Sequence, residues 1–164
     1  MQVLSFHNLD SALQAIVTHF INSYNPNAVI YDLMYRTGCR YIEAAELKNW
    51  LYYDYDTVKL FTSKAGEIRI FKTSELPEPF MNMIKHNEER TATHSYRTIV
   101  RDFYAASPYR ILYTGNKPIA LHAFRHNYVK RLIFQGCSPA EIQYKMGHKD
   151  ISNTLKYINS IIYY

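Results

Sequence analysis

Cysteine is scarce in this sequence, and the two that it has do not form a metal-binding or disulfide pattern. Cys39 and Cys137 lie far apart, and neither belongs to a CxxC motif or to a Cys/His cluster. We therefore expect neither a structural zinc site nor a disulfide framework. Both cysteines are interpreted as small apolar side chains.

Long apolar runs are also missing. No stretch approaches the roughly 20 residues that a membrane-spanning helix needs. The N-terminus, MQVLSFHNLD, lacks the basic region followed by an apolar region that marks a signal peptide. We expect a soluble cytoplasmic protein with no membrane partner. Internal repeats, low-complexity tracts and long linkers are absent, and 164 residues suit one domain with a sizeable core.

Acidic residues do not outnumber basic ones. The chain has 19 Lys and Arg residues against 14 Asp and Glu, which gives a net charge of +5 with neutral histidines and a pI of about 9.1. This balance permits an anionic partner such as nucleic acid but does not demand one. Aromatic residues make up 15% of the chain, with 16 tyrosines. A core rich in hydroxyl-bearing rings explains that content as well as any function does.

Apolar periodicity and capping residues predict a mostly helical chain. The first predicted helix has Asn8 or Asp10 as its opening residue. Its apolar stripe consists of Leu9, Leu13, Ile16, Val17 and Phe20. A later helix has Ser138 as its N-cap, Pro139 in its first turn and Glu141 completing a capping box. The predicted helices cover residues 8–24, 27–37, 41–50, 75–87, 93–107, 121–135, 138–146 and 151–160, with Gly38 and Gly136 ending two of them.

One segment, residues 56–72, predicts two β-strands around a turn at Ala65–Gly66. Its apolar residues alternate along the two strands at Val58, Leu60, Ile68 and Ile70. A second turn is expected at Gly115–Asn116. The fold class is therefore mainly α with a small antiparallel β-sheet (α+β), in a single domain.

Candidate phosphate-binding residues occur on the helix that contains LHAFRH. His122 and Arg125 are three residues apart, so they share one helix face. A guanidinium can bind two phosphate oxygens, and an imidazole can donate or accept a proton. The alternative is a solvated basic helix face, because Lys130 and Arg131 follow closely.

Two further candidates precede that helix. In TGCRYIEAAEL, Arg40 follows a Thr-Gly turn and can reach an oxyanion, while Glu43 can orient its neighbours. The alternative is a surface ion pair worth a few tenths of a kcal/mol. Lys64 lies where a strand enters the hairpin turn, and a lysine there could protonate a leaving oxygen. Most hairpin lysines only keep sheet edges soluble.

The last candidates are His148 and Tyr157, nine residues apart. A phenol that attacks a phosphodiester must lose its proton, and the charge of the resulting phosphorane must be neutralised. Two arginines, one or two histidines and one lysine around Tyr157 would supply that chemistry. The sequence shows no Asp/Glu cluster that would favour a two-metal site instead.

Taken together, these motifs resemble the catalytic domain of the tyrosine recombinases, the phage integrase family. TGCRYIEAAELK, SKAGEIR, LHAFRH and MGHKDISNTLKY follow the family order of roughly TGxRxxEhxxL, a hairpin lysine, HxLRH, LGH and a tyrosine nine positions later. The resemblance covers about residues 9–160. Each motif alone is weak, but four in order with the matching His-to-Tyr interval are specific. The resemblance implies the recombinase catalytic-domain fold and no metal or other cofactor.

Roles follow from the resemblance position by position. It makes Arg40 and Arg125 the two arginines that clamp the scissile phosphate, and it makes Tyr157 the nucleophile of a type IB reaction with a 3′-phosphotyrosyl intermediate. His122 and His148 match the two active-site histidines, and Glu43 matches the supporting acidic position. Lys64 matches the lysine thought to protonate the leaving 5′-hydroxyl; Lys59 and Lys72 are rivals, but the SKxG context favours Lys64.

The resemblance also implies partners and origin. Double-stranded DNA is the expected substrate, with a monomer in its absence and a synaptic tetramer upon it. A cytoplasmic, nucleoid-associated protein of a prokaryote, phage or mobile element is expected.

The sequence departs from the family pattern in a few places. Phe124 and Met146 replace the usual leucines, which should preserve packing. Residues 1–164 are expected to form one catalytic domain, without the N-terminal core-binding domain of the family. Only seven residues follow Tyr157, so the tail-mediated assembly of relatives is in doubt.

Three other functions stay open. The stretch SPAEIQYKMGHKDISNTLKYI also resembles a helix-turn-helix, which would suit a non-enzymatic DNA-binding module. That reading explains the basic charge but not the spacing of Arg40, Lys64, His122 and Arg125. A type IB topoisomerase-like relaxing enzyme would share the chemistry, and a helical interaction domain with no catalytic role is the third alternative.

Overall fold

The computed structural model describes residues 6–62, 67–91, 94–107, 113–114, 117–118 and 120–162. The predicted turns at Ala65–Gly66 and Gly115–Asn116, and Lys64 with them, lie outside these residues. The described helices are α1 (Phe6–Asn22), α2 (Ala28–Thr37), α3 (Tyr41–Ala45), α4 (Glu78–Lys85), α5 (Tyr96–Ala106), α6 (His122–Phe134), α7 (Pro139–Met146) and α8 (Ile151–Ile162). The strands are β1 (Trp50–Tyr52), β2 (Thr57–Phe61), β3 (Ile68–Lys72), β4 (Tyr113–Thr114) and β5 (Lys117–Pro118), and Leu47–Asn49 and Thr73–Glu75 form 3-10 turns.

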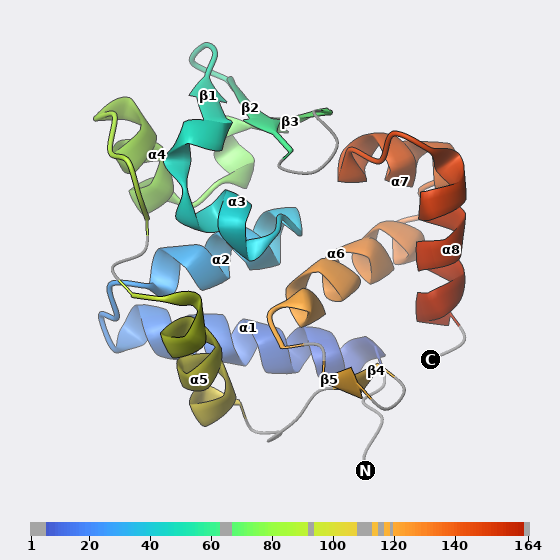
Figure 1. Ribbon diagram of the computed structural model, residues 1–164, viewed down its shortest axis with the longest axis horizontal. Coiled ribbons are helices and arrows are strands. Elements are labelled where there is room, and N and C mark those ends of the chain that lie inside the picture. Colours follow the sequence, from blue (N-terminus) through green and yellow to red (C-terminus); the bar gives the residue numbers. More distant parts are fainter. Residues whose placement is uncertain are drawn as a thin grey trace.

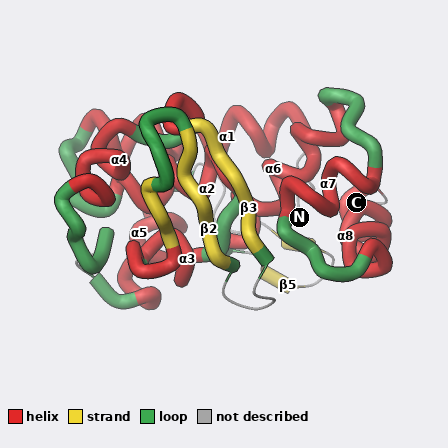
Figure 2. The backbone as a smooth tube through the Cα atoms, turned by 90° about the horizontal axis from the view of Figure 1, so that it is seen from above, coloured by secondary structure: helices red, strands yellow, loops and turns green. Residues whose placement is uncertain are grey.

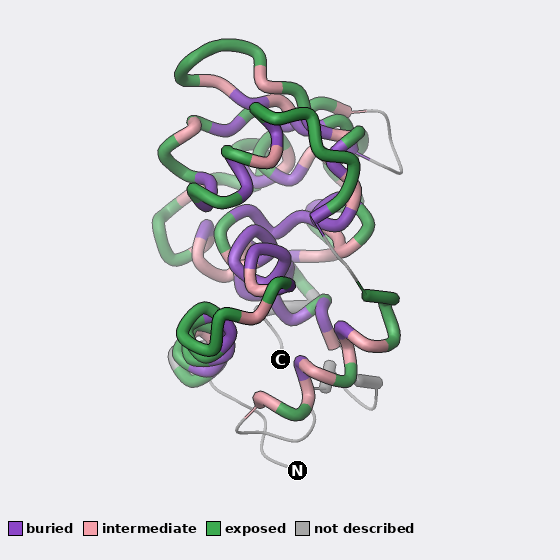
Figure 3. The backbone as a smooth tube through the Cα atoms, turned by 90° about the vertical axis from the view of Figure 1, so that its left-hand side faces the viewer, coloured by how far each residue is buried: buried purple, intermediate pink, exposed green. Residues whose placement is uncertain are grey.

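The helices α1, α2 and α6 pack together as the frame of the molecule, and α6 crosses α1 in Figure 1. All five apolar residues of the predicted stripe of α1 are buried, as expected for the inner face of an amphipathic helix. They join α2, the sheet, α4, α5 and the first turn of α6 in one hydrophobic cluster, here called the main core. Its fully buried members include Leu13, Ile30, Leu33 and Phe124. Figure 3 shows these buried stretches inside, with exposed loops around them.

A second, smaller hydrophobic cluster lies where α6, α7 and α8 meet. This small cluster consists of Val129, Leu132, Ile142, Met146 and Ile158. The capping box of α7 is present as predicted, because Ser138 Oγ accepts from the Glu141 N–H and Glu141 Oε2 accepts from the Ser138 N–H. Helices α7 and α8 stand together at one end of the molecule in Figure 1. The small cluster therefore supports the segment that carries the last two candidate site residues.

The sheet has the antiparallel order β1-β2-β3, as Figure 2 shows from above. Strands β2 and β3 were predicted, whereas β1 was not, and its first residue, Trp50, was assigned to the end of a third helix. That assignment was wrong beyond Ala45, because the chain leaves α3 and pairs Trp50 with Leu60. The small antiparallel sheet within a mainly helical chain is confirmed.

The two faces of the sheet differ from the simple alternating pattern. Val58 and Leu60 of β2 are buried, but Ile68 and Ile70 of β3 face outward with 45% and 50% of their surfaces exposed. Arg69 takes the inner position between them and is only 1% exposed. Its guanidinium donates to the main-chain oxygens of Thr37 and Lys145. These bonds tie β3 to α2 and α7 and explain why a charged residue faces inward.

Two glycines end helices at the edge of the candidate site. Gly38 closes α2 and Gly147 closes α7, both in the left-handed conformation with φ of 62° and 64°. A Cβ atom at position 38 would lie 2.7 Å from the Tyr128 side chain. Glycine is therefore required there for its lack of a side chain as well as for its positive φ. The chain can then turn sharply at both points, which places Arg40 and His148 just beyond the two helix ends. None of the described helices is long and apolar enough to cross a bilayer.

Candidate active site

Arg40 and Glu43 form a buried pair at the start of α3. Glu43 has no exposed surface, and its Oε2 accepts from the Arg40 main-chain N–H at 2.7 Å while its Oε1 accepts from Arg40 Nη1 at 3.2 Å. The Glu43 carbonyl in turn accepts from Trp50 Nε1 at 2.7 Å. The alternative of a surface ion pair is therefore wrong, because the carboxylate is enclosed. The pair holds the Arg40 guanidinium beside the cleft with little freedom to move.

Arg125 points inward from α6 rather than into solvent. Only 3% of its surface is exposed, and its Nη1 donates to the Gly38 carbonyl at 2.8 Å. Burial, together with the nearby positive charges of Arg69 and Arg40, lowers the pKa of Arg125 to about 10. The guanidinium therefore stays charged at neutral pH. The alternative of a solvated basic helix face fails for Arg125, whereas His122 at the start of the same helix is exposed.

His148 follows the end of α7 and contacts groups from two helices. Its Nε2 lies 3.2 Å from Arg125 Nη2, and its Nδ1 lies 2.9 Å from the Thr154 hydroxyl of α8. Burial and the positive charges of Arg125, Arg40 and Arg69 lower the pKa of His148 to about 4. The imidazole is therefore neutral at physiological pH.

Tyr157 lies on α8 with its ring between two histidines. The ring centroid of His126 is 5.0 Å away in a stacked arrangement with an interplanar angle of 29°, and that of His148 is 6.2 Å away, edge to face. Burial raises the pKa of the Tyr157 phenol above its ordinary value, while Arg125 and Arg40 act in the opposite direction. The phenol therefore needs a proton acceptor before it can act as a nucleophile.

One cleft brings most of the predicted site residues together. It has a volume of about 380 Å³ and is lined by residues of α2, α3, α5, α6 and α8 and of the segments beside them. Among these residues are Arg40, His122, Arg125, His148 and Tyr157. Lys64 lies outside the described residues, so its relation to the cleft stays a prediction. Of its rivals, Lys59 places its ammonium 3.7 Å above the Tyr53 ring.

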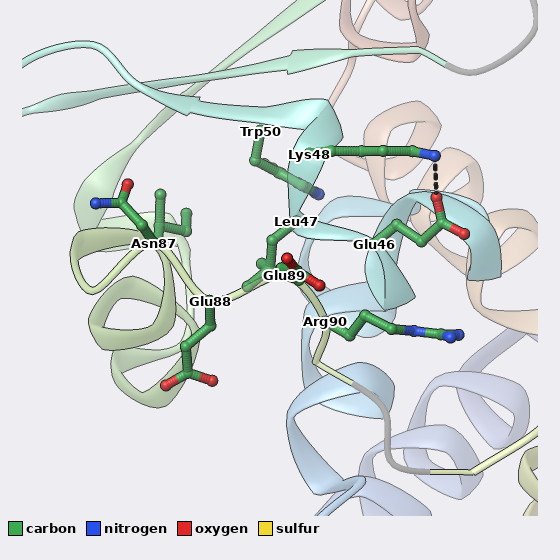
Figure 4. Close-up of a pocket in the computed structure, with 9 residues that line it drawn as sticks. Glu46, Leu47, Lys48, Trp50, Asn87, Glu88, Glu89 and Arg90 are labelled. Carbon is green, nitrogen blue, oxygen red and sulfur yellow. Dashed lines mark ion pairs between the residues drawn. The ribbon is translucent and has the colours of Figure 1, made fainter.

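A larger pocket lies elsewhere, against the 3-10 turn before β1 and the segment after α4. Figure 4 shows its lining residues, with the Lys48 ammonium 2.7 Å from Glu46 Oε2. None of the predicted site residues belongs to it, and its charged groups are of mixed sign. Size alone would therefore select the wrong pocket in this molecule. The smaller cleft is the one that combines two guanidinium groups, imidazoles and a phenol.

Three residues of the site region were missed from the sequence. His126 follows Arg125 and stacks on Tyr157, and burial with the neighbouring His122 lowers its pKa to about 4. Thr154 contacts His148, and Arg69 adds positive charge beneath the cleft. The second histidine of LHAFRH was the only local signal. Within the described part of the chain, His, Cys, Asp and Glu side chains form no group of three or more able to hold a metal ion.

Comparisons with known proteins identify the family of the chain and the relatives of its fold. The sequence profile described as the phage integrase family matches residues 2–161, which is nearly the whole chain. No curated protein matches significantly by sequence.

The fold is similar to that of two solved recombinases. One is the XerH site-specific recombinase bound to palindromic difH substrate, with a TM-score of 0.61 and 15% identity over 91% of this chain and 48% of that one. The other is the Tn1549 transposon integrase in complex with circular intermediate DNA, with a TM-score of 0.55 and 19% identity over 95% of this chain and 62% of that one. The chain thus spans about half the length of the first and less than two thirds of the second.

Proposed function

The chain belongs to the phage integrase family, and from this membership we propose that it is the catalytic domain of a site-specific DNA recombinase. Its activity would be to cut a DNA strand and to rejoin it to another through a covalent phosphotyrosyl intermediate. The observation that supports this most is the single cleft that holds Arg40, Arg125, His148 and Tyr157. A non-enzymatic helix-turn-helix module would not need a buried guanidinium and a second, partly buried one beside a partly buried phenol.

In the first step, the Tyr157 oxygen attacks the scissile phosphorus. A bond forms between phosphorus and the phenol oxygen, and the bond from phosphorus to the 5′-oxygen breaks. The phenol proton passes to a neutral imidazole of the cleft, and the leaving 5′-oxygen takes a proton from Lys64. Rejoining reverses these transfers when a 5′-hydroxyl attacks the phosphotyrosine, so no external energy source is required.

Charge on the phosphorane is neutralised by Arg40 and Arg125. Arg125 is fixed through Gly38, and Arg40 is fixed through the buried Glu43. Because both are held before the substrate arrives, little reorganisation accompanies the reaction. In our proposal these two fixed cations fill the role that metal ions have in many other phosphoryl-transfer enzymes.

The proposed substrate is double-stranded DNA. The two solved relatives were crystallised with a difH substrate and with a circular intermediate DNA. A net charge of +5 fits a polyanionic partner, and binding should then weaken as salt rises because phosphate contacts release counterions. We propose that the chain is a monomer alone and assembles into a tetramer on DNA.

The nucleophile is tested with a nicked suicide substrate, on which the cut strand cannot be rejoined. We expect Tyr157→Phe to abolish covalent protein–DNA adducts and to leave DNA binding nearly unchanged, because only the attacking oxygen is removed. Tyr144→Phe is the matched control, since Tyr144 is 64% exposed on α7. Adducts that persist in Tyr157→Phe would refute the assignment.

The leaving-group role of Lys64 has its own test. A substrate whose 5′-bridging oxygen is replaced by sulfur releases a thiolate, which needs no proton from an acid. We expect Lys64→Ala to cut the ordinary substrate slowly and the sulfur substrate at nearly the normal rate. Lys59→Ala serves as the control and should behave like the unchanged protein on both. A Lys64→Ala defect of equal size on both substrates would show that this lysine has another role.

A further inference from the structure

Thr154 occupies a position between two residues of the cleft that the sequence does not reveal. Its side chain is completely buried on α8, and it precedes Tyr157 by one helical turn. Its hydroxyl oxygen lies 2.9 Å from Nδ1 of His148, which belongs to the segment between α7 and α8. Buried hydroxyls normally have a specific hydrogen-bond partner, and here that partner is the imidazole.

The hydrogen bonds around His148 fix which ring nitrogen carries the proton. A guanidinium can donate but never accept, so at 3.2 Å from Arg125 Nη2 the Nε2 atom must be the acceptor. The neutral ring then has its single proton on Nδ1. Consequently Nδ1 donates to Thr154, and the hydroxyl oxygen is the acceptor. Burial and the charges of Arg125, Arg40 and Arg69 keep the ring neutral, because they lower its pKa to about 4.

This bond also connects the segment after α7 with helix α8. Positions 154 and 157 are three apart on one helix and share a face. A rotation or shift of α8 therefore changes the placement of the Tyr157 phenol and the His148 ring together. Among its described residues, α8 contributes Ile158 to the small cluster and packs Tyr157 against it, and the bond to His148 adds a polar contact that holds the helix in register with the cleft.

We propose that Thr154 is a positioning residue: its hydroxyl holds His148 as the Nδ1–H tautomer and ties that ring to the helix that carries Tyr157. In this tautomer Nε2 has a lone pair, so it can accept a proton but cannot donate one. When a phosphate draws the Arg125 donors to its own oxygens, Nε2 is released as a base. It then takes the phenol proton: the O–H bond breaks, an N–H bond forms, and His148 becomes an imidazolium opposite the charged phosphorane.

The tautomer is tested directly in the DNA-free protein, independently of the catalytic role, which rests on the proposed function. Long-range 1H–15N correlation spectra of the histidine-labelled full chain distinguish protonated from unprotonated ring nitrogens. The His148 signals are assigned by their loss in His148→Gln. We expect a protonated Nδ1 and an unprotonated Nε2 near neutral pH. A protonated Nε2 in the unchanged protein would overturn the proposal without any variant.

Three variants separate positioning from packing. Thr154→Val has nearly the same volume but no acceptor, so the Nδ1–H of His148 loses its partner; we expect the Nδ1 resonance to shift and covalent capture to slow by about tenfold or more. Thr154→Ser keeps the oxygen and should restore both. Thr91→Val removes another buried hydroxyl, which donates to the Ala44 carbonyl, and should leave the His148 spectrum unchanged.

The outcomes remain distinct if part of the proposal fails. A shifted spectrum in Thr154→Val with no covalent capture by any variant or by the unchanged protein would support the tautomer but reject the proposed function. An unchanged His148 spectrum in folded Thr154→Val would reject the role of Thr154 itself. Equal slowing by Val and Ser would show that packing, rather than the hydrogen bond, accounts for the effect. Near-ultraviolet circular dichroism checks that each variant is folded.

Discussion

The cleft joins two parts of the molecule that are built differently. Arg40 and Glu43 stand on the main core, where Leu33 and many other side chains are fully buried. His148 and Tyr157 stand on the small cluster, to which α8 contributes Ile158, while Ile151 and Leu155 of the same helix are 38% and 43% exposed. The part with the proposed phosphate-binding residues therefore stands on the larger core, and the part with the proposed nucleophile stands on the smaller cluster.

This difference suggests a division of tasks. An anion clamp works best when its donors are fixed in advance, and burial in the main core provides that rigidity. In our proposal α8 carries the nucleophile, and its support by the smaller cluster leaves it freer to shift, since elements that move are drawn from the less stable parts of a fold. Arg69 links the two parts through the main-chain oxygens of Thr37 and Lys145, and Arg125 links them through the Gly38 carbonyl and the His148 ring.

The largest effect on stability is expected in the main core. Leu33→Ala removes a side chain with no exposed surface and should lower the free energy of unfolding by about 3–5 kcal/mol, since it leaves a cavity among tightly packed helices. Urea unfolding followed by circular dichroism measures the change. The loss should appear in α1 and α8 alike, because the main core supports the whole chain. A loss confined to α2 would argue against that dependence.

The next largest effect is expected when Arg125, which contacts both parts, is replaced. Arg125→Ala should slow covalent capture by about a hundredfold to a thousandfold, because the clamp stabilises charge that develops in the transition state. Capture on the nicked substrate measures the rate. Arg101→Ala is the control, since the Arg101 side chain is 71% exposed and pairs with Asp102 outside the cleft. A normal capture rate for Arg125→Ala would contradict its place in the clamp.

A matched truncation in the small cluster should cost less and act locally. Ile158→Ala should lower the free energy of unfolding by about 2 kcal/mol, at the low end for buried aliphatic side chains, because Ile158 keeps 8% of its surface exposed and belongs to the smaller cluster. Native-state hydrogen exchange should show faster exchange in α8 and little change in α2. Equal acceleration in both helices would mean that the two parts do not open separately.

The smallest effect concerns pH. The pKa of His126 falls to about 4 in the folded chain from about 6.5 when exposed, so below pH 6.5 the unfolded state binds more protons. Stability should therefore decrease as the pH falls, by about 1–2 kcal/mol between pH 6.5 and pH 5 from this residue alone. His126→Phe keeps a flat ring against Tyr157 and should reduce the pH dependence. An identical pH dependence in that variant would assign it to His148 instead.

Much of the fold could be predicted from sequence because local physics determines it. The stripe of α1 and the capping box of α7 depend on residues within a turn or two of each other. Strand β1 could not be predicted in this way, since its three residues become a strand only by pairing with β2. The alternating apolar residues of β3 predicted a strand but not which of its faces is buried. That face is set by Arg69, which donates to main-chain carbonyls of α2 and α7.

The candidate site divides along similar lines. Arg40, Arg125, His148 and Tyr157 could be proposed because motif spacing singles them out, and the structure places them around one cleft. Thr154 was not identified, because a threonine three residues before a tyrosine is common. Its significance arises only when the turn after α7 brings His148 back against α8.

Gly147 carries a consequence for how this sequence can change over time. A Cβ atom there would lie 2.9 Å from Cγ of Arg69 and 3.1 Å from Cγ2 of Thr62. Arg69 belongs to strand β3, and Thr62 directly follows strand β2. Any side chain at 147 would therefore push against the base of the hairpin and displace His148 at once. We expect positions 147 and 69 to vary together among relatives: a larger residue at 147 should occur only where 69 is smaller than arginine.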